Sequence, residues 1–193
     1  MYRKIEDKRA QLSQRMIYQA LVEVIERKNF ENISVTEVVE KAQVARSTFY
    51  RNFDNLHDVL QMAADQSFQG LYDYVIDYYQ NRLESEGKVI NFIKPFLEYW
   101  YEDSEVIELL IKSRSFDLLL QTLAKTIEKL IDLFEPKKGV ITEYKNYYLA
   151  IRTSLAISVL IEWIRNDKDI PPEKLAEILR KQVEESIKQK ILI

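Results

Sequence analysis

The sequence predicts an all-α protein of about nine helices, and three observations support this prediction. Glycine and proline are scarce, with 3 and 4 among 193 residues, so the turns that a β-rich fold requires are missing. Apolar residues make up 47% of the chain and charged residues 31%, as is typical of a globular protein with its own core. Apolar residues also recur at helical spacing through most of the chain.

The first sixty residues predict three helices in quick succession. Apolar residues across Leu12–Ile25 follow the 3.6-residue period, which predicts an amphipathic helix. Ser34 and Glu37 have capping-box spacing, so a short helix is expected over about 35–42. A tight connection then leads to a third short helix over about 45–52. Two short helices joined by so brief a turn are typical of a helix-turn-helix unit.

The rest of the chain predicts a long connecting helix and a helical C-terminal domain. The long helix is expected over about 55–84, with Asp54 or Asn55 as its cap. The sequence therefore divides into a DNA-binding domain at 1–55, with its motif at about 34–53, and a C-terminal domain at 66–193. The further helices are expected over about 88–102, 104–113, 115–134, 141–166 and 172–190.

Composition argues against several classes of protein. The chain has no cysteine and a single histidine, His57, so neither a metal site nor a catalytic triad is indicated. Its three glycines form no phosphate-binding loop, and no cofactor or enzymatic activity is expected. The apolar run at 147–164 contains Arg152 and Glu162, which favours a buried helix over a membrane span. The N-terminus lacks an apolar signal segment, so we expect a cytoplasmic protein without membrane contact.

The segment 43–53, QVARSTFYRNF, contains no acidic residue although the chain carries a net charge of −3. Phe49 and Phe53 are expected to face the core by helical spacing. Arg46 can donate to a phosphate or bidentately to guanine, and Tyr50 can donate a phenolic hydrogen bond. This segment therefore predicts an interface with double-stranded DNA. The candidate DNA-binding residues are Thr36, Arg46, Ser47, Thr48, Tyr50 and Arg51.

Residues 33–60 resemble the N-terminal DNA-binding domain of the TetR/AcrR family of transcriptional regulators. Gln43 stands where that family usually has glycine, and costs about 1 kcal/mol if its backbone is left-handed. Ala45 replaces the usual Ser or Thr cap, and Leu56 replaces a lysine that often contacts phosphate. The matching residues are Thr36, Val39, Ala42, Val44, Thr48, Tyr50, Phe53, Val59 and Leu60.

The resemblance implies a homodimeric repressor that a small-molecule effector releases from a palindromic operator. It implies dimerisation through about 141–190 and an effector pocket among the middle helices. Arg152 is a candidate pocket residue because a charge among apolar neighbours must be paired, hydrated or bound to an anion. The candidate effector-binding residues are Trp100, Arg114, Tyr148 and Arg152. An apolar stripe on each of the last two helices is expected to form the dimer interface or, alternatively, to pack only within the chain. The stripes are Leu149, Thr153, Ala156, Ile157, Leu160 and Ile164 on one helix, and Leu175, Ile178, Leu179, Val183 and Ile187 on the other.

The residues leave a second function open, that of a helical DNA-binding adaptor or activator controlled by a protein partner. A polar-lined pocket of a few hundred Å³ would favour a small-molecule sensor. An exposed apolar patch over a collapsed core would favour a protein partner.

Overall fold

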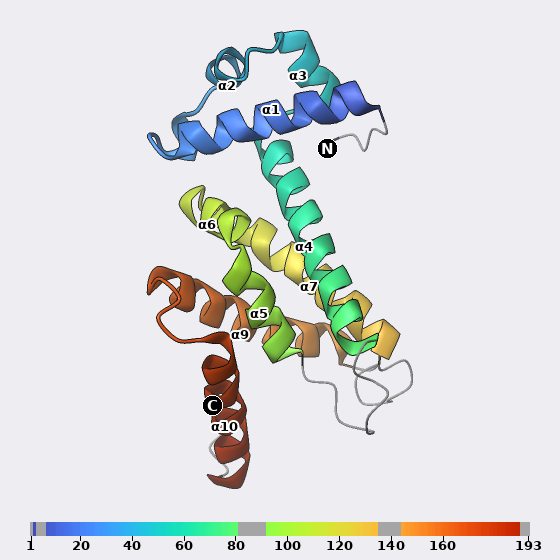
Figure 1. The fold of residues 1–193 in the computed structure, drawn as a ribbon, viewed down its shortest axis with the longest axis vertical. Helices are drawn as coiled ribbons and strands as arrows, with labels where there is room; N and C mark the ends of the chain where they lie inside the picture. Colours follow the sequence, from blue (N-terminus) through green and yellow to red (C-terminus); the bar gives the residue numbers. More distant parts are fainter. Residues whose placement is uncertain (1, 3–6, 81–91, 135–143, 190–193) are drawn as a thin grey trace. The chain divides into compact units, whose positions relative to one another are not determined.

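The computed structural model describes residues 2, 7–80, 92–134 and 144–189, with side chains described up to Gln182. Within these ranges every regular element is a helix, which confirms the all-α prediction (Figure 1). The elements are α1 (Lys8–Ile25), the 3-10 turn η1 (Phe30–Asn32), α2 (Val35–Lys41), α3 (Arg46–Asn52), α4 (Leu56–Gln80), α5 (Ile93–Glu102), α6 (Glu105–Lys112), α7 (Phe116–Phe134), α9 (Lys145–Arg165) and α10 (Pro172–Gln189).

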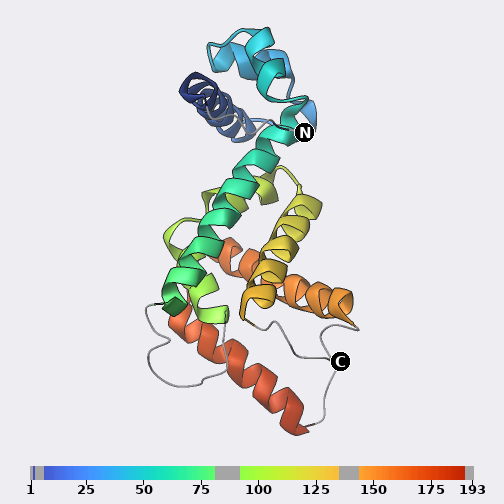
Figure 2. The same ribbon diagram turned by 90° about the vertical axis from the view of Figure 1, so that its right-hand side faces the viewer.

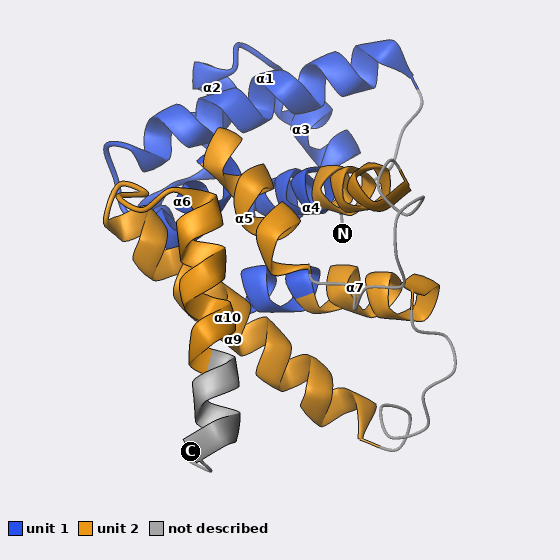
Figure 3. Cartoon of the chain, turned by 60° about the horizontal axis from the view of Figure 1, so that its bottom comes forward, with its two compact units in different colours: residues 1–68, 105–123 blue, residues 69–104, 124–193 orange. Residues whose placement is uncertain are grey.

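The chain folds into two compact units, coloured separately in Figure 3. Unit 1 comprises residues 1–68 and 105–123, and unit 2 comprises residues 69–104 and 124–193. Helices α4 and α7 contribute to both units, and α4 is one unbroken helix along its described length (Figure 2). The sequence placed residues 105–123 in the C-terminal domain, whereas they lie in the same compact unit as the helix-turn-helix region.

Unit 1 is organised around α1, which packs against α2, α3 and α6. Phe49 and Phe53 face this core, with 0% and 1% of their surfaces exposed, as helical spacing predicted. The fully buried side chains of the unit also include Ile17, Leu21, Val38, Val59, Leu60, Phe68, Ile107, Leu110 and Leu119. Because Phe49 and Phe53 are buried, the opposite face of α3 is exposed to solvent.

Two ion pairs tie α2 to the end of α1. Lys28 contacts Glu37 at 2.9 Å, and Lys41 contacts Glu23 at 2.5 Å. The hydrogen bond from Lys28 lowers the pKa of Glu37, and the one from Lys41 lowers the pKa of Glu23. All four side chains are exposed, so each pair contributes little to stability. Their larger effect is on local charge, because the Glu23 carboxylate offsets the positive charge of Lys41 beside the basic segment 43–53.

The predicted capping box at the start of α2 is only half formed. The Ser34 hydroxyl accepts a hydrogen bond from the Glu37 backbone amide at 3.2 Å, as the spacing predicted. The Glu37 carboxylate instead accepts a hydrogen bond from the Lys28 ammonium at 2.9 Å. A long-range ion pair has therefore replaced the reciprocal bond of the local motif.

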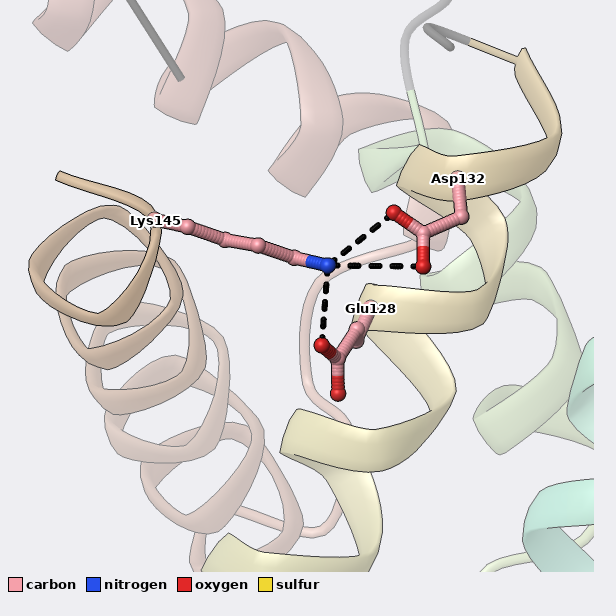
Figure 4. A network of polar contacts seen from close by, with 3 residues as sticks. All are labelled: Glu128, Asp132 and Lys145. Carbon is pink, nitrogen blue, oxygen red and sulfur yellow. Dashed lines mark hydrogen bonds and ion pairs between the residues drawn. The ribbon is translucent and has the colours of Figure 1, made fainter. Parts of the chain in front are cut away.

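Unit 2 is built from the second half of α4 with α5, the end of α7, α9 and α10. Trp100 on α5 is fully buried, and α5 packs against α10. Gly70 on α4 lets the Tyr99 phenol approach closely, because a Cβ at this position would collide with its hydroxyl. Lys145, the first residue of α9, reaches Glu128 at 2.9 Å and Asp132 at 3.0 Å on α7 (Figure 4). These two carboxylates raise the pKa of Lys145.

Helix α9 is less buried than its sequence predicted. It is long and apolar enough, by length and composition alone, to cross a membrane, yet only 28% of its most apolar window is buried. Because one such helix is weak evidence for a membrane span, its open apolar face is the more informative feature. The exposed large side chains of α9 and its N-cap are Tyr144, Tyr147, Ile151 and Leu155.

The stripe expected to form the dimer interface lies largely inside unit 2. Leu149, Thr153, Ile157 and Leu160 are all buried within the single chain. On α10, Leu175 is buried and Ile178 is 42% exposed. Leu179 is half-buried, and the side chains of Val183 and Ile187 lie outside the described part. The burial of these α9 residues supports the alternative interpretation, in which this stripe packs within the chain.

Candidate nucleic-acid interface

The connection between α2 and α3 is a tight turn closed by two backbone hydrogen bonds. The Gln43 amide donates to the Glu40 carbonyl at 3.1 Å, and the Val44 amide donates to the Val39 carbonyl at 3.0 Å. This pattern requires a left-handed residue just after the helix, and Gln43 has φ 55°. The turn thus has the geometry for which glycine is best suited.

Helix α3 begins without a side-chain cap. Ala45 occupies the N-cap position, with φ −70° and ψ 147°, and its side chain can make no hydrogen bond. The helix is instead held by burial of Phe49 and by bonds from the Thr48 and Phe49 amides to the Ala45 carbonyl, at 2.9 and 3.2 Å. Packing in unit 1 compensates for the missing cap.

The outer face of α3 carries four of the six candidate DNA-binding side chains. Arg46, Ser47, Tyr50 and Arg51 are exposed, and Tyr50 retains 46% of its accessible surface. Thr48 is half-buried at the edge of this face. Positions 46, 47, 50 and 51 share one side of a helix because the chain turns once in 3.6 residues. The exposed face therefore presents two guanidinium groups and two hydroxyls, with no acidic residue in the helix.

Contacts within α3 orient two of these side chains. The Arg46 guanidinium lies 6.0 Å from the centre of the Tyr50 ring, and that ring meets Phe49 edge-on at 5.4 Å. Arg51 donates a long hydrogen bond of 3.4 Å to the Thr48 hydroxyl. The buried Phe49 thereby supports Tyr50 from behind, and Tyr50 supports Arg46.

Asn52, the last residue of α3, faces the interior of unit 1 and is not exposed for DNA contact. Only 1% of its surface is exposed, and its side-chain amide donates to the Thr48 carbonyl at 2.8 Å. Thr36, by contrast, is exposed in the first turn of α2. Asn52 therefore supports α3 from within, while Thr36 is available on the surface.

The start of α4 is capped by the chain itself. Asn55 accepts a hydrogen bond from the Asp58 amide at 3.1 Å, and the Asp58 carboxylate accepts one from the Asp54 amide at 2.9 Å. The sequence had offered Asp54 or Asn55 as the cap, and the structure selects Asn55. Leu56 is 7% exposed and faces the core, so it cannot take over the phosphate contact of the lysine it replaces.

The four candidate effector-binding residues do not meet in one site. Trp100 is fully buried on α5 in unit 2, whereas Arg114 is exposed in unit 1. Tyr148 and Arg152 do come together, with the Arg152 guanidinium 4.4 Å from the Tyr148 ring centre. Arg152 itself is exposed on α9. Tyr148 and Arg152 are four residues apart and share a helix face by sequence spacing, whereas nothing in the sequence relates them to Arg114.

Arg114 lines a groove that sequence patterns did not indicate. The groove has a volume of about 680 Å³ and lies within unit 1, between the start of α4 and the turn from α6 to α7. Arg114 has φ 56°, and His57 packs edge-on against Phe30 at 4.8 Å. The groove joins segments distant in sequence, so no local pattern could have revealed it. Its lining includes Phe30, Glu31, Leu56, His57, Gln61, Arg114, Asp117 and Gln121.

Comparison with known proteins adds independent information. A family model described as "Bacterial regulatory proteins, tetR family" matches residues 17–61, and one described as "Transcriptional regulator C-terminal region" matches residues 87–185. Over 78 residues, 39% of the chain, the sequence is 30% identical to the HTH-type dhaKLM operon transcriptional activator DhaS of Lactococcus lactis subsp. lactis. That match spans only 42% of the length of this relative.

Solved structures share the fold over nearly the whole chain. Lin0861 from Listeria innocua has a TM-score of 0.72 at 19% identity, covering 95% of this chain and 96% of its own. A putative TetR-family transcriptional regulator from Syntrophomonas wolfei has a TM-score of 0.59 at 17% identity, with 95% and 98% covered. At 19% and 17% sequence identity, these similarities show a shared fold and nothing more.

Proposed function

Because the chain belongs to the TetR family of bacterial transcriptional regulators, we propose that it is a homodimeric cytoplasmic repressor that a small molecule releases from a palindromic operator. Membership makes it a DNA-binding regulator of transcription and not an enzyme. The proposal adds the operator symmetry, the dimer, the effector and the sign of regulation.

The observation that carries the proposal is the exposed, acid-free face of α3. In a helix-turn-helix unit the second helix of the motif enters the major groove, and its early residues meet base edges. Arg46 lies at the start of α3, where it can donate bidentately to guanine or to a phosphate. Tyr50 and Arg51 are one turn further on and suit contacts to the phosphate backbone. Thr36, Ser47 and Thr48 complete the proposed set.

One short α3 reads few base pairs, so the proposal requires two copies. A two-fold dimer binds half-sites about one helical turn, roughly 34–36 Å, apart, which makes the operator palindromic. The exposed apolar stripe of α9 suits such an interface. Tyr147 and Ile151 remain 74% and 69% exposed in the single chain, although side chains of this size are usually covered.

Selection from random DNA duplexes with the purified protein tests this function. We expect an enriched palindrome whose affinity falls steeply with rising salt, because Lys and Arg contacts to phosphate displace counterions. Enrichment of a non-palindromic site, or of no site, would contradict the proposal.

The Arg46→Ala variant is expected to bind the selected palindrome about 100-fold more weakly. The substitution removes one guanidinium from each half-site, so the two weakening factors multiply. The measurement is a titration of labelled operator, with Arg165→Ala as the control because Arg165 is an exposed arginine at the end of α9. Equal affinities for the Arg46 variant and the wild type would remove Arg46 from the interface.

For the effector, we propose two alternative sites, the Tyr148–Arg152 pair in unit 2 and the Arg114 groove in unit 1. Trp100 is fully buried and belongs to neither. The polar lining of the Arg114 groove and the Tyr148–Arg152 pair support this assignment. Release requires the effector to bind the form with low DNA affinity more tightly than the form that binds DNA.

The alanine variant at the site that binds the effector, Arg114→Ala or Arg152→Ala, is expected to repress a reporter gene normally yet to need at least about 10-fold more effector for release, a typical size of allosteric coupling. The effector would first be found by screening metabolites for release of labelled operator. Equal dose responses for a variant and the wild type would exclude that residue from effector binding.

Activation controlled by a protein partner remains the second candidate function. It is favoured by the DhaS relative, which is described as a transcriptional activator and shares 30% identity over 78 residues. Both features that were to distinguish the two functions are present, a polar-lined groove and an exposed apolar stripe. Reporter output in cells with and without the protein separates them, since a repressor lowers expression from its operator and an activator raises it.

A further inference from the structure

Gln43 stands in a backbone conformation that its side chain makes unfavourable. Its φ of 55° is imposed by the turn that ends α2, and the two hydrogen bonds of that turn need no side chain. Glycine would adopt the same conformation without a steric penalty. Residues kept in such regions tend to cluster at functional sites, so the glutamine calls for a reason outside the turn itself.

Unit 1 does not supply that reason. The Gln43 side chain is exposed, and it makes no hydrogen bond to any residue that the structure describes. Lys168, a left-handed residue in unit 2, differs in this respect, because its ammonium donates to the Tyr101 carbonyl at 2.9 Å. The Gln43 amide is therefore left available for a partner outside the chain.

The position of Gln43 indicates what that partner is. The residue immediately precedes Val44 and Ala45, so it sits at the entrance to α3, three residues before Arg46. No acidic residue occurs from Gln43 to the end of α3, which favours the approach of a polyanion. The amide group of glutamine donates two hydrogen bonds and carries no charge.

We propose that Gln43 is a further DNA-contacting residue, whose side-chain amide donates a hydrogen bond to a phosphate oxygen at the edge of each half-site. The inference rests on the proposed function, because it assumes that α3 enters the major groove. Such a contact fixes the position of the protein on the duplex without reading sequence. It explains why an amide side chain occupies a position for which glycine is better suited.

The substitution Gln43→Gly is expected to change stability and binding in opposite directions. The melting temperature should rise by about 2 °C, because the left-handed backbone no longer carries a side chain. Affinity for the operator should fall by about 10-fold, because each protomer can no longer donate this hydrogen bond to a charged acceptor. A purely structural role would raise stability and leave binding unchanged.

Two further variants sharpen the test. Gln43→Glu keeps the shape and the backbone penalty but removes the donor and adds a negative charge, so it should bind at least as weakly as Gln43→Gly. Asp167→Gly is the matched control, since Asp167 is exposed in unit 2 and has a similar φ of 53°. It should relieve a comparable backbone penalty without changing DNA affinity.

Salt dependence distinguishes the amide from the arginines. A neutral donor displaces no counterion, so the slope of log affinity against log salt should be the same for Gln43→Gly and wild type. If Arg46 contacts phosphate, Arg46→Ala should reduce that slope by about one for each phosphate that the arginine no longer neutralises.

The experiment is titration of the selected operator with wild type, Gln43→Gly, Gln43→Glu and Asp167→Gly, alongside their melting temperatures. The proposal is supported if both Gln43 variants bind more weakly while Gln43→Gly melts higher. It is overturned if wild type binds specifically and Gln43→Gly binds equally well or more tightly. If wild type itself shows no specific DNA binding, the proposed function fails, and the Gln43 contact fails with it.

Discussion

Placing glutamate at both Ile151 and Leu155 is expected to separate the proposed dimer into monomers and to lower operator affinity at least about 100-fold. The two side chains lie one turn apart on α9 and are 69% and 52% exposed in the single chain. A two-fold axis would bring each changed residue into the interface twice, so four carboxylates would be buried in an apolar contact. Sedimentation analysis at several protein concentrations measures the dimer directly.

The control for this prediction is Leu133→Glu. Leu133 on α7 is 51% exposed, which is close to the exposure of Leu155, but it lies outside the exposed apolar stripe of α9. Its variant should remain dimeric and bind the operator normally. A dimer that persists in the Ile151 and Leu155 double variant would show that this stripe is not the interface, and Ile178 on α10 would become the next candidate for the dimer contact.

The two apolar stripes of α9 show where periodicity stops being informative. Leu149, Thr153 and Ile157 recur at helical spacing, but so do Tyr147, Ile151 and Leu155. A helix with two apolar stripes has one for the core of its own chain and one for something else. Only tertiary packing decides between them, because both stripes satisfy the same sequence pattern. The locations of the helices, in contrast, followed from periodicity and from caps such as Asn55.

The exposed face of α3 could be predicted from the sequence more completely than the proposed effector sites. Residues 46–51 are consecutive, so local spacing alone assigned Phe49 to the inside and Arg46 and Tyr50 to the outside. The effector candidates are scattered from α5 to α9, and their relation depends on how distant segments pack. Sequence spacing likewise could not foresee that Glu23 neutralises Lys41, since that pair joins two different helices.

The departures at Gln43 and Ala45 were correctly located as features of the turn and the cap. The sequence predicted an energetic cost at Gln43 only if its backbone was left-handed, and its φ of 55° shows that it is. Ala45 indeed provides no cap. The sequence did not indicate how the protein compensates for the missing cap of α3. Fully buried Phe49 and the carbonyl bonds of Ala45 hold α3 in place without a capping side chain.

Because α3 depends so strongly on packing, truncation of Phe49 to alanine is expected to lower the free energy of unfolding by about 3–5 kcal/mol. Phe49 is fully buried and its ring contacts both Phe53 and Tyr50, at 5.7 and 5.4 Å between ring centres. Alanine would leave a cavity and remove the support of Tyr50 and, through it, of Arg46. Urea unfolding followed by circular dichroism measures the loss of stability.

Tyr50→Phe separates this effect from a direct loss of DNA contact. It retains the ring that meets Phe49 edge-on and removes only the exposed hydroxyl, so stability should stay within about 0.5 kcal/mol of wild type. Operator affinity should nevertheless fall, because the phenol can no longer donate to phosphate. Phe49→Ala should weaken binding even though its side chain never reaches the surface. If Phe49→Ala unfolded at the wild-type urea concentration, the claim that core packing positions α3 would be wrong.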